Sequence, residues 1–212
     1  MSYTNLLDQI DQMQSDDEKN IDLLGSLCIN SDAEVRFRAV EKIVALFASR
    51  IASPSLIKLM TERLDDADEL VRCASLEFFE DHAATINLGK CINMLKDKEA
   101  IVRAQAARVL GNINNDTATL SLIEAIKVAV DFEKVSLNFA LFQLNPSVGL
   151  EPILKLLDSP DHQARCAAAN LLPTFKGSEF HDLVTARLTV SLATDATRSS
   201  KLAKLDALSA MH

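Results

Sequence analysis

The chain has 212 residues, of which 48% are hydrophobic, so it can bury a large core and is not a disordered protein. Only five glycines and five prolines are present, which favours helices over the turn-rich composition of a sheet protein. The formal net charge of -8 argues against a nucleic-acid backbone as the primary ligand, because phosphate binding relies on an excess of Lys and Arg.

Acidic residues concentrate in the N-terminal part of the chain. Residues 1–81 carry 17 acidic and 8 basic side chains, whereas residues 82–212 carry 13 and 14. A basic partner that approaches the N-terminal part would therefore be steered favourably. The sequence shows neither a signal-peptide pattern nor a run approaching the ~20 apolar residues of a membrane span, and its four cysteines form no C-x-x-C pair. We expect reduced thiols, a cytoplasmic protein and no membrane partner.

In chain order, the pattern predicts one domain over 1–212, made of an N-terminal capping helix (1–16), five repeats (17–177) and a degenerate C-terminal capping repeat (178–212). The repeats are marked by a phrase that reads acid, two residues, Val or Ala, Arg, two residues, small residue. It occurs at Asp32–Ala39, Asp68–Ser75, Glu99–Ala106 and Asp161–Ala168, with a weaker copy at Phe132–Phe139. The Val or Ala of each copy serves as its marker, which gives Val35, Val71, Val102, Val135 and Ala164. Consecutive markers lie 36, 31, 33 and 29 residues apart, which is the length of one two-helix unit.

Each marker lies just inside the start of a predicted inner helix, and the acid three residues earlier is placed to cap it. Another amphipathic segment precedes each marker and predicts the outer helix of the pair. These outer segments are roughly Glu18–Ile29, Pro54–Leu64, Thr85–Leu95, Thr117–Val130 and Val148–Leu157. Every unit is thus predicted to be a helical hairpin.

The phrase Val102-Arg-Ala-Gln-Ala-Ala-Arg-Val-Leu-Gly111 resembles the short HEAT-like repeats typified by phycobilisome lyases, and the resemblance covers about residues 18–175. It implies an all-α fold, a right-handed α-α superhelix of about five to six hairpins. Ankyrin and tetratricopeptide repeats fit less well, because the chain has neither a Thr-Pro-Leu-His turn nor any Trp. The repeat is shared by proteins of many functions, so it predicts architecture and not activity.

Positions on the inner helices separate into faces when each residue advances ~100° around the axis. Marker plus four, five and eight are small or apolar with few exceptions, of which Gln143 is one, and they are predicted to form the core. Marker plus one carries an arginine in four of the five copies: Arg36, Arg72, Arg103 and Arg165. These arginines form either a basic ligand-binding stripe or a ladder that bonds acids and carbonyls of neighbouring repeats. The adjacent acids and the resemblance favour the ladder.

Marker plus three, six and ten remain for solvent and, in this type of repeat, line the concave surface. These columns include Ala74 and Leu141 as well as the polar residues that we select as candidate partner-binding residues. The candidates are Arg38, Glu41, Glu77, Asp81, Gln105, Arg108, Asn138 and Asn170. The alternative is an ordinary solvated face. The mixed polar character with a concentration of acids suits a protein partner better than phosphate.

Catalytic and metal-binding patterns are not evident, so we expect no enzyme activity, no cofactor and no metal. The four histidines lack metal-ligand spacing, and no phosphate loop or nucleophile elbow occurs. His82, after Glu80 and Asp81, is interpreted as a helix-end histidine favoured by the dipole rather than a catalytic group. The acidic run from Asp65 to Glu69 lacks the Gly and spaced oxygens of a calcium loop and is interpreted as a capped, solvated turn.

The leading hypothesis is a non-catalytic scaffold, a monomer or weak homo-oligomer, that binds a basic protein through its concave face. An immunity or antitoxin-like protein, or an adaptor, would be a specific form of it. The alternative, which the resemblance permits, is a bilin (phycobilisome) lyase or lyase subunit. A HEAT-like DNA glycosylase would need a basic surface with aromatic side chains, and this chain has one Tyr and no Trp.

Overall fold

The computed structural model describes residues 3–14, 18–48, 50–113, 115–148 and 150–212, and within them every regular element is a helix. The α-helices are α1 (Tyr3–Gln12), α2 (Glu18–Leu27), α3 (Ala33–Phe47), α4 (Pro54–Arg63), α5 (Glu69–Asp81), α6 (Leu88–Met94), α7 (Ala100–Gly111), α8 (Asp116–Ile126), α9 (Asp131–Leu144), α10 (Glu151–Lys155), α11 (His162–Leu171), α12 (His181–Thr194) and α13 (Arg198–Met211). Short 3-10 helices follow four of them: η1 (Ala83–Thr85), η2 (Pro146–Val148), η3 (Leu156–Asp158) and η4 (Leu172–Phe175). None of the described helices is both long and apolar enough to cross a bilayer.

The chain divides into two compact units, Met1–Ile113 and Asn114–His212. The first contains α1 to α7 and the second α8 to α13. Each unit has its own packed interior. The single domain expected from the sequence, with its capping segments, stays a prediction.

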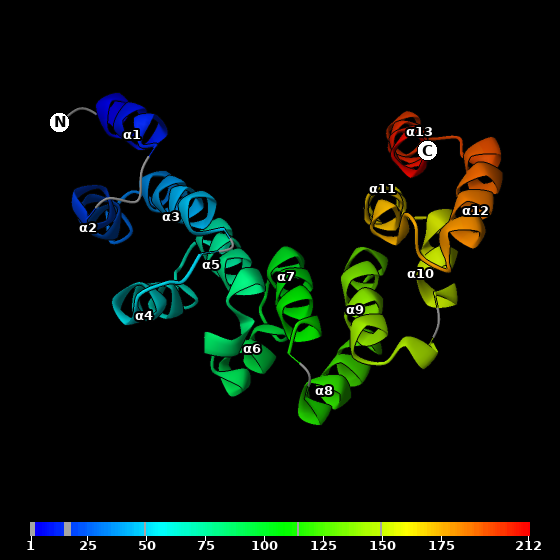
Figure 1. The fold of residues 1–212 in the computed structure, drawn as a ribbon, viewed down its shortest axis with the longest axis horizontal. Coiled ribbons are helices and arrows are strands. Elements are labelled where there is room, and N and C mark those ends of the chain that lie inside the picture. Colours follow the sequence, from blue (N-terminus) through cyan, green and yellow to red (C-terminus); the bar gives the residue numbers. More distant parts are fainter. Residues whose placement is uncertain (1–2, 15–17, 49, 114, 149) are drawn as a thin grey trace. The chain divides into compact units, whose positions relative to one another are not determined.

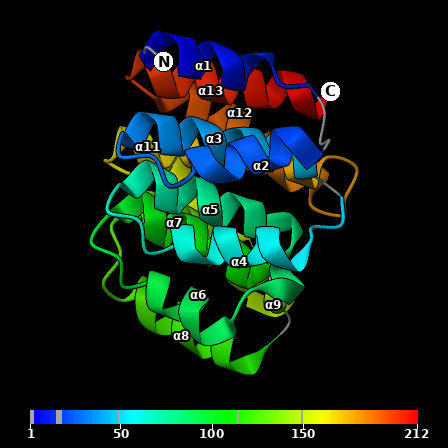
Figure 2. The same ribbon diagram turned by 90° about the vertical axis from the view of Figure 1, so that its left-hand side faces the viewer.

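Unit 1 is a stack of helical hairpins in two rows. In the first row α3 packs on α5 and α5 on α7, with α1 against α3. In the second row α2, α4 and α6 each pack on the helix that follows them in the chain (Figure 1). Figure 2 shows the first-row helices α3 and α5 running side by side, with α2 and α4 lying against them. Three hairpins and one additional helix therefore make up this unit.

Unit 2 repeats the same arrangement. Its first row is α9, α11 and α13, in which α11 packs against both neighbours. The second row pairs α8 with α9, the α10–η3 segment with α9 and α11, and α12 with α13. The predicted all-α solenoid fold of about five to six hairpins is confirmed, and each predicted outer segment contains a helix.

The helix starts show why the repeated phrase folds in this way. Asp32 and Asp68 have extended backbones, and each carboxylate accepts hydrogen bonds from two backbone N–H groups of the next turn. Asp161 caps α11 through the N–H of Gln163. Glu99 does not cap α7 with its side chain; instead the Asp97 carboxylate accepts from the Glu99 N–H, at 2.9 Å. Three of the four predicted acidic caps are thus confirmed.

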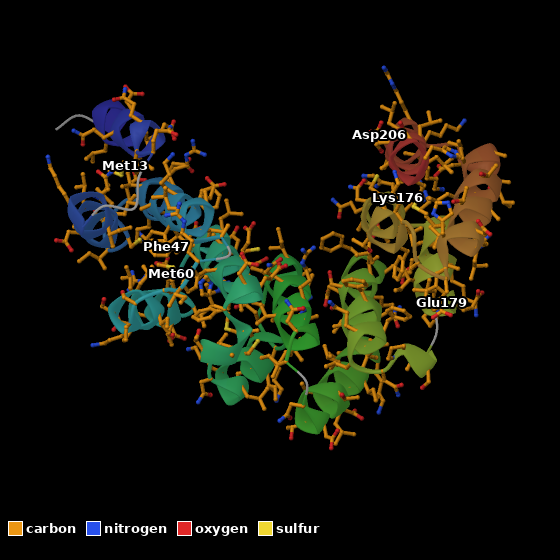
Figure 3. The ribbon with its side chains drawn as sticks, viewed as in Figure 1. Met13, Phe47, Met60, Lys176, Glu179 and Asp206 are labelled. Carbon is orange, nitrogen blue, oxygen red and sulfur yellow. The ribbon has the colours of Figure 1, made fainter. Side chains whose placement is uncertain are left out.

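The predicted core positions, marker plus four, five and eight, fill the interior of each unit, except that Phe139 of α9 is half-buried and Gln143 is exposed. In unit 1 all of these positions are fully buried, for example Ala39, Leu76 and Leu110. Figure 3 shows side chains filling the space between the two rows, where Met60 of α4 is fully buried. Unit 2 buries a comparable cluster that includes Leu157, against which several half-buried aromatic rings pack. Edge-to-face contacts, with centroids 5.4 to 6.1 Å apart, join Phe139, Phe142, Phe175 and Phe180.

The arginines at marker plus one form the predicted ladder. Arg36 donates two hydrogen bonds to the Asp66 carboxylate of the next hairpin, at 2.8 and 2.7 Å, and two more to carbonyls of its own interhelical turn. Arg72 repeats this pattern with Asp97, at 2.8 Å for both bonds. Arg103 donates to the carbonyls of Asp97 and Lys98. These guanidinium groups are therefore occupied within the stack.

The last hairpin of unit 2 is held by a more deeply buried version of the same device. Arg165 bonds the Asp195 carboxylate at 3.2 Å and the Thr197 hydroxyl at 2.6 Å. Lys204, only 1% exposed, donates to Asp195 at 2.6 Å, to the Ser191 hydroxyl at 2.7 Å and to a carbonyl of the preceding hairpin. Burial acts to raise the pKa of Asp195, but the hydrogen bonds from Lys204 and its neighbours outweigh burial and hold it well below its ordinary value.

Candidate functional site

An open groove of about 610 Å³ crosses the first row of unit 1, and we call it the acidic groove. Three helices line it: α1, α3 with its C-cap residue, and the last turns of α5. Its residues are Ile10, Asp11, Arg38, Glu41, Lys42, Val44, Ala45, Ala48, Glu77, Glu80 and Asp81. Five carboxylates and two cations thus surround a floor of small and apolar side chains.

The sequence places these residues together through helical periodicity. Arg38, Glu41 and Ala45 lie three and four residues apart on α3, so they share one face of that helix. Glu77 and Glu80 lie three apart on α5 in the same way. Because the opposite faces of α3 and α5 are packed into the core, the charged faces are left toward the groove.

Ion pairs hold the two edges of the acidic groove. Arg38 donates to Asp11 of α1 and to Glu41, each at 2.9 Å, and so joins α1 to α3. On the other side Arg108 of α7 chelates Glu80, at 2.8 and 3.0 Å. Gln105 and Asn112 of α7 also donate to Glu80, to its carboxylate and its backbone carbonyl respectively. These contacts tie neighbouring first-row helices together from the groove side.

Glu77 differs from the other acids of the groove. Among the described residues it has no ion-pair partner, although it lies between Glu41 and Glu80. Partial burial raises the pKa of Glu77, and the negative charges of Glu80 and Glu41 raise it further, against the opposing effect of Arg108. The α3–α5 junction therefore carries an excess of negative charge that Arg108 offsets only in part.

A second hollow of about 380 Å³ adjoins the acidic groove and shares Lys42, Ala45 and Ala48 with it. The rest of its lining is Met13, Gln14, Leu46 and Arg50. We call it the α1 hollow. Its lining is apolar with two cations and no acid, so the polarity changes from acidic to apolar and basic along one continuous depression.

The structure divides the eight sequence-predicted binding residues into three groups. Four of them, Arg38, Glu41, Glu77 and Asp81, line the acidic groove. Gln105 and Arg108 contact it through Glu80. Asn138 and Asn170 belong to unit 2, where Asn138 donates to the carbonyl of Lys134 at 2.7 Å and Asn170 is exposed. Partner binding by any of them stays a prediction.

Two residues at the marker-plus-three and marker-plus-six positions, which are predicted to face solvent, are instead buried. Ala74 is 3% exposed and Leu141 is 8% exposed, because an adjacent helix of the same unit covers the edge of the expected surface column. Conversely, the pattern missed four polar contributors to the depression: Asp11, Lys42, Glu80 and Arg50. Asp11 lies on a helix without the repeated phrase, so no marker identifies it.

Other titratable groups are explained by packing. His82 stacks on Phe78 and places its two ring nitrogens 2.8 Å from the carbonyls of Phe78 and Arg50, as expected of a helix-end histidine. In the acidic run, Asp68 caps α5, which confirms the capped turn. The turn is not solvated throughout, because the Asp66 side chain is 4% exposed and accepts from Arg36. The part of the chain that the structure describes holds no group of three His, Cys, Asp or Glu side chains arranged for a metal.

A depression in unit 2, of about 390 Å³, is lined by the Lys204–Asp195–Arg165 network. Its charged groups bond one another: Asp158 accepts from Arg187 and from the Ser191 hydroxyl, while Asp195 accepts from Lys204 and Arg165. Because these charges are already paired, the depression is explained by the packing of the last hairpin. The acidic groove remains the candidate site.

Comparison with known proteins gives a likeness in architecture alone. No family model matches the sequence, and neither does any curated protein. An engineered protein of known structure is similar over 91% of this chain and 96% of its own, with 18% identity and a TM-score of 0.44. A designed armadillo repeat protein, solved in complex with the peptide (KR)4, is similar over 99% of this chain and 92% of its own, with 18% identity and a TM-score of 0.40. These likenesses contribute nothing to the choice of site or ligand.

Proposed function

We propose that the protein is a non-catalytic scaffold that binds a basic protein partner through the acidic groove of unit 1. The observation that carries the proposal is Glu77, an acid in an open groove with like charges beside it and no cation of its own among the described residues. A lysine or arginine of a partner would relieve this repulsion on binding, and charge complementarity of this kind governs both encounter rate and specificity.

The wider charge distribution supports the same partner. Unit 1 has 19 acidic and 13 basic residues in the sequence, whereas residues 114–212 have 11 and 9. The arginines that could have formed a basic stripe are engaged in the ladder, so they do not offset the groove. A cytoplasmic adaptor, or an immunity protein that neutralises a basic toxin, would be a specific form of this function. No feature of the described groove favours the lyase alternative.

The test is capture of partners from the native host on the immobilised full chain, followed by affinity measurement with the purified partner. Reversing two acids, Glu41→Lys with Glu77→Lys, should weaken binding at least tenfold and reduce its salt dependence. The matched control is Glu62→Lys on the exposed side of α4, which should bind as the unmodified chain does. Partner binding that is unaffected by the double reversal would refute the groove as the binding site.

A further inference from the structure

We infer that the depression in unit 1 recognises a short extended peptide segment in which an arginine is followed by an apolar side chain, with the arginine at the α3–α5 junction and the apolar group in the α1 hollow. The inference rests on the proposed function and names the chemistry of the partner segment. Two independent features of the depression, one for each half of the ligand, support it.

The binding position proposed for the ligand arginine is inferred from the contacts between first-row helices. The α1–α3 junction is bridged by Arg38 with Asp11, and the α5–α7 junction by Arg108 with Glu80. At the α3–α5 junction, inside the groove, two acids lie on the facing helices. Among the residues that the structure describes, Glu41 bonds only Arg38 of its own helix and Glu77 has no ion-pair partner. A ligand arginine would supply the bridge that the two flanking junctions already possess.

Arginine fits this position better than lysine for a geometric reason. Both flanking bridges use the planar guanidinium fork: Arg38 reaches two carboxylates with separate nitrogens, and Arg108 chelates one carboxylate with two. A ligand fork could engage Glu41 and Glu77 at once, whereas an ammonium is a compact point charge with stronger hydration. The expected preference is therefore for arginine over lysine at equal charge.

The lining of the α1 hollow supports the apolar half of the proposed ligand. Met13, Leu46 and Ala45 offer apolar contact there, while Lys42 and Arg50 at its rim would repel a second basic side chain. Because the α1 hollow shares three lining residues with the acidic groove, one continuous segment can occupy both. Burying one leucine side chain contributes roughly 1.5–3 kcal/mol before ordering costs, which is enough to detect in a peptide series.

The experiment uses the full-length chain labelled with nitrogen-15 and a set of capped hexapeptides followed by NMR titration. Each peptide contains glycines, one arginine, and one leucine placed one, two or three residues later; companion peptides replace the leucine by glycine or the arginine by lysine. We expect the best arginine–leucine spacing to bind at least tenfold more tightly than its glycine companion and at least threefold more tightly than its lysine companion.

Two variants test which part of the depression binds each half of the ligand. Glu77→Gln should reduce the affinity of the arginine–leucine peptides to that of their lysine companions. Glu62→Gln on α4 is the control for this variant. Ala45→Gln adds bulk at an exposed helical position that lines both hollows, so it should remove the leucine preference while the chain stays folded. Ala186→Gln, at an exposed position of α12, is the control for that substitution.

The outcomes separate this inference from the proposed function. Equal affinity for leucine and glycine peptides, or binding by lysine peptides as tight as by arginine peptides, would overturn the two-part recognition and leave a general acidic groove. Absence of binding by every peptide would also overturn it. If the Glu41→Lys, Glu77→Lys chain nevertheless loses its host partner, the proposed function stands on its own.

Discussion

Arg72 is the most deeply buried arginine of the unit 1 ladder, and its removal should destabilise that unit strongly. It is 5% exposed and donates four hydrogen bonds: two to the Asp97 carboxylate and two to the carbonyls of Asp66 and Ala67, at 2.8 to 3.0 Å. Replacement by methionine keeps most of the aliphatic volume, so the measured loss reports the guanidinium contacts rather than a cavity.

The magnitude follows from what Arg72→Met leaves behind. The Asp97 side chain, 11% exposed, would retain its negative charge but lose its cation, and two turn carbonyls would lose their donors. Breaking a buried ion pair by removing one partner costs about 3–5 kcal/mol, since the remaining charge is uncompensated. For a unit of this size that corresponds to a fall in melting temperature of roughly 12–20 °C. Arg72→Lys keeps the charge without the fork and should lose about half as much.

The pH dependence provides a second signature of the same interaction. Burial acts to raise the pKa of Asp97, but hydrogen bonds from Arg72 and from the Glu99 N–H outweigh burial and lower it below its ordinary value. A lowered folded-state pKa means that the stabilisation is present above the unfolded value of about 4 and is lost as pH falls through the folded value. The difference in unfolding free energy between the unmodified chain and Arg72→Met should therefore narrow below pH 4.

The assay is urea unfolding of both chains between pH 3 and pH 7, followed by circular dichroism, with thermal scans at pH 7. The exposed Glu62→Gln change on α4 is the control and should lie within about 0.5 kcal/mol of the unmodified chain. If Arg72→Met costs less than about 1 kcal/mol at pH 7, or if its cost does not change with pH, the Arg72–Asp97 ion pair does not stabilise the stack.

Three further predictions concern other parts of the molecule. Lys204→Met should destabilise unit 2 by about 3 kcal/mol in urea unfolding, because Asp195 is left buried with a longer contact to Arg165, and peptide binding should not change. Glu77→Gln should raise the unfolding free energy at pH 7 by about 0.5 kcal/mol or less, because the raised pKa of Glu77 means that its ionised form opposes folding. This gain in stability should vanish toward pH 4, and a loss of stability at pH 7 would contradict the prediction. Burial raises the pKa of the Cys28 and Cys91 thiols to about 12, so both should resist a thiol reagent in the native chain and react once it is unfolded, as mass spectrometry of the labelled peptides would show.

The sequence by itself determined the elements and their inward faces. The recurring phrase combines an acid before the helix, a buried marker and an arginine one residue later, and each part acts within its own hairpin or on the next one. Asp68 caps α5, Val71 enters the core, and Arg72 bonds the turns on both sides. Because these interactions are local or repeat with the period of the chain, the spacing of residues is sufficient to predict them.

The groove could not be derived in the same way. Helical periodicity indicates that Glu41 and Glu77 face away from the core, but the meeting of two acids across the α3–α5 junction depends on loop lengths and on the register between helices. The same register buries Ala74, brings Asp11 of the unmarked α1 to Arg38, and saturates Glu80 with donors from α7. Marker intervals that vary from 29 to 36 residues leave that register open.

The buried lysine of the last hairpin shows the same division between local pattern and tertiary packing. Lys204 is buried within α13, a helix without the repeated phrase, so no marker in the sequence identifies this lysine as a core residue. Only the packed structure places Asp195, Ser191 and the Leu157 carbonyl around its ammonium group. A charge is buried stably where several acceptors converge on it. Here they come from the end of α12 and from the η3 segment of the preceding hairpin, so the convergence is decided by tertiary packing.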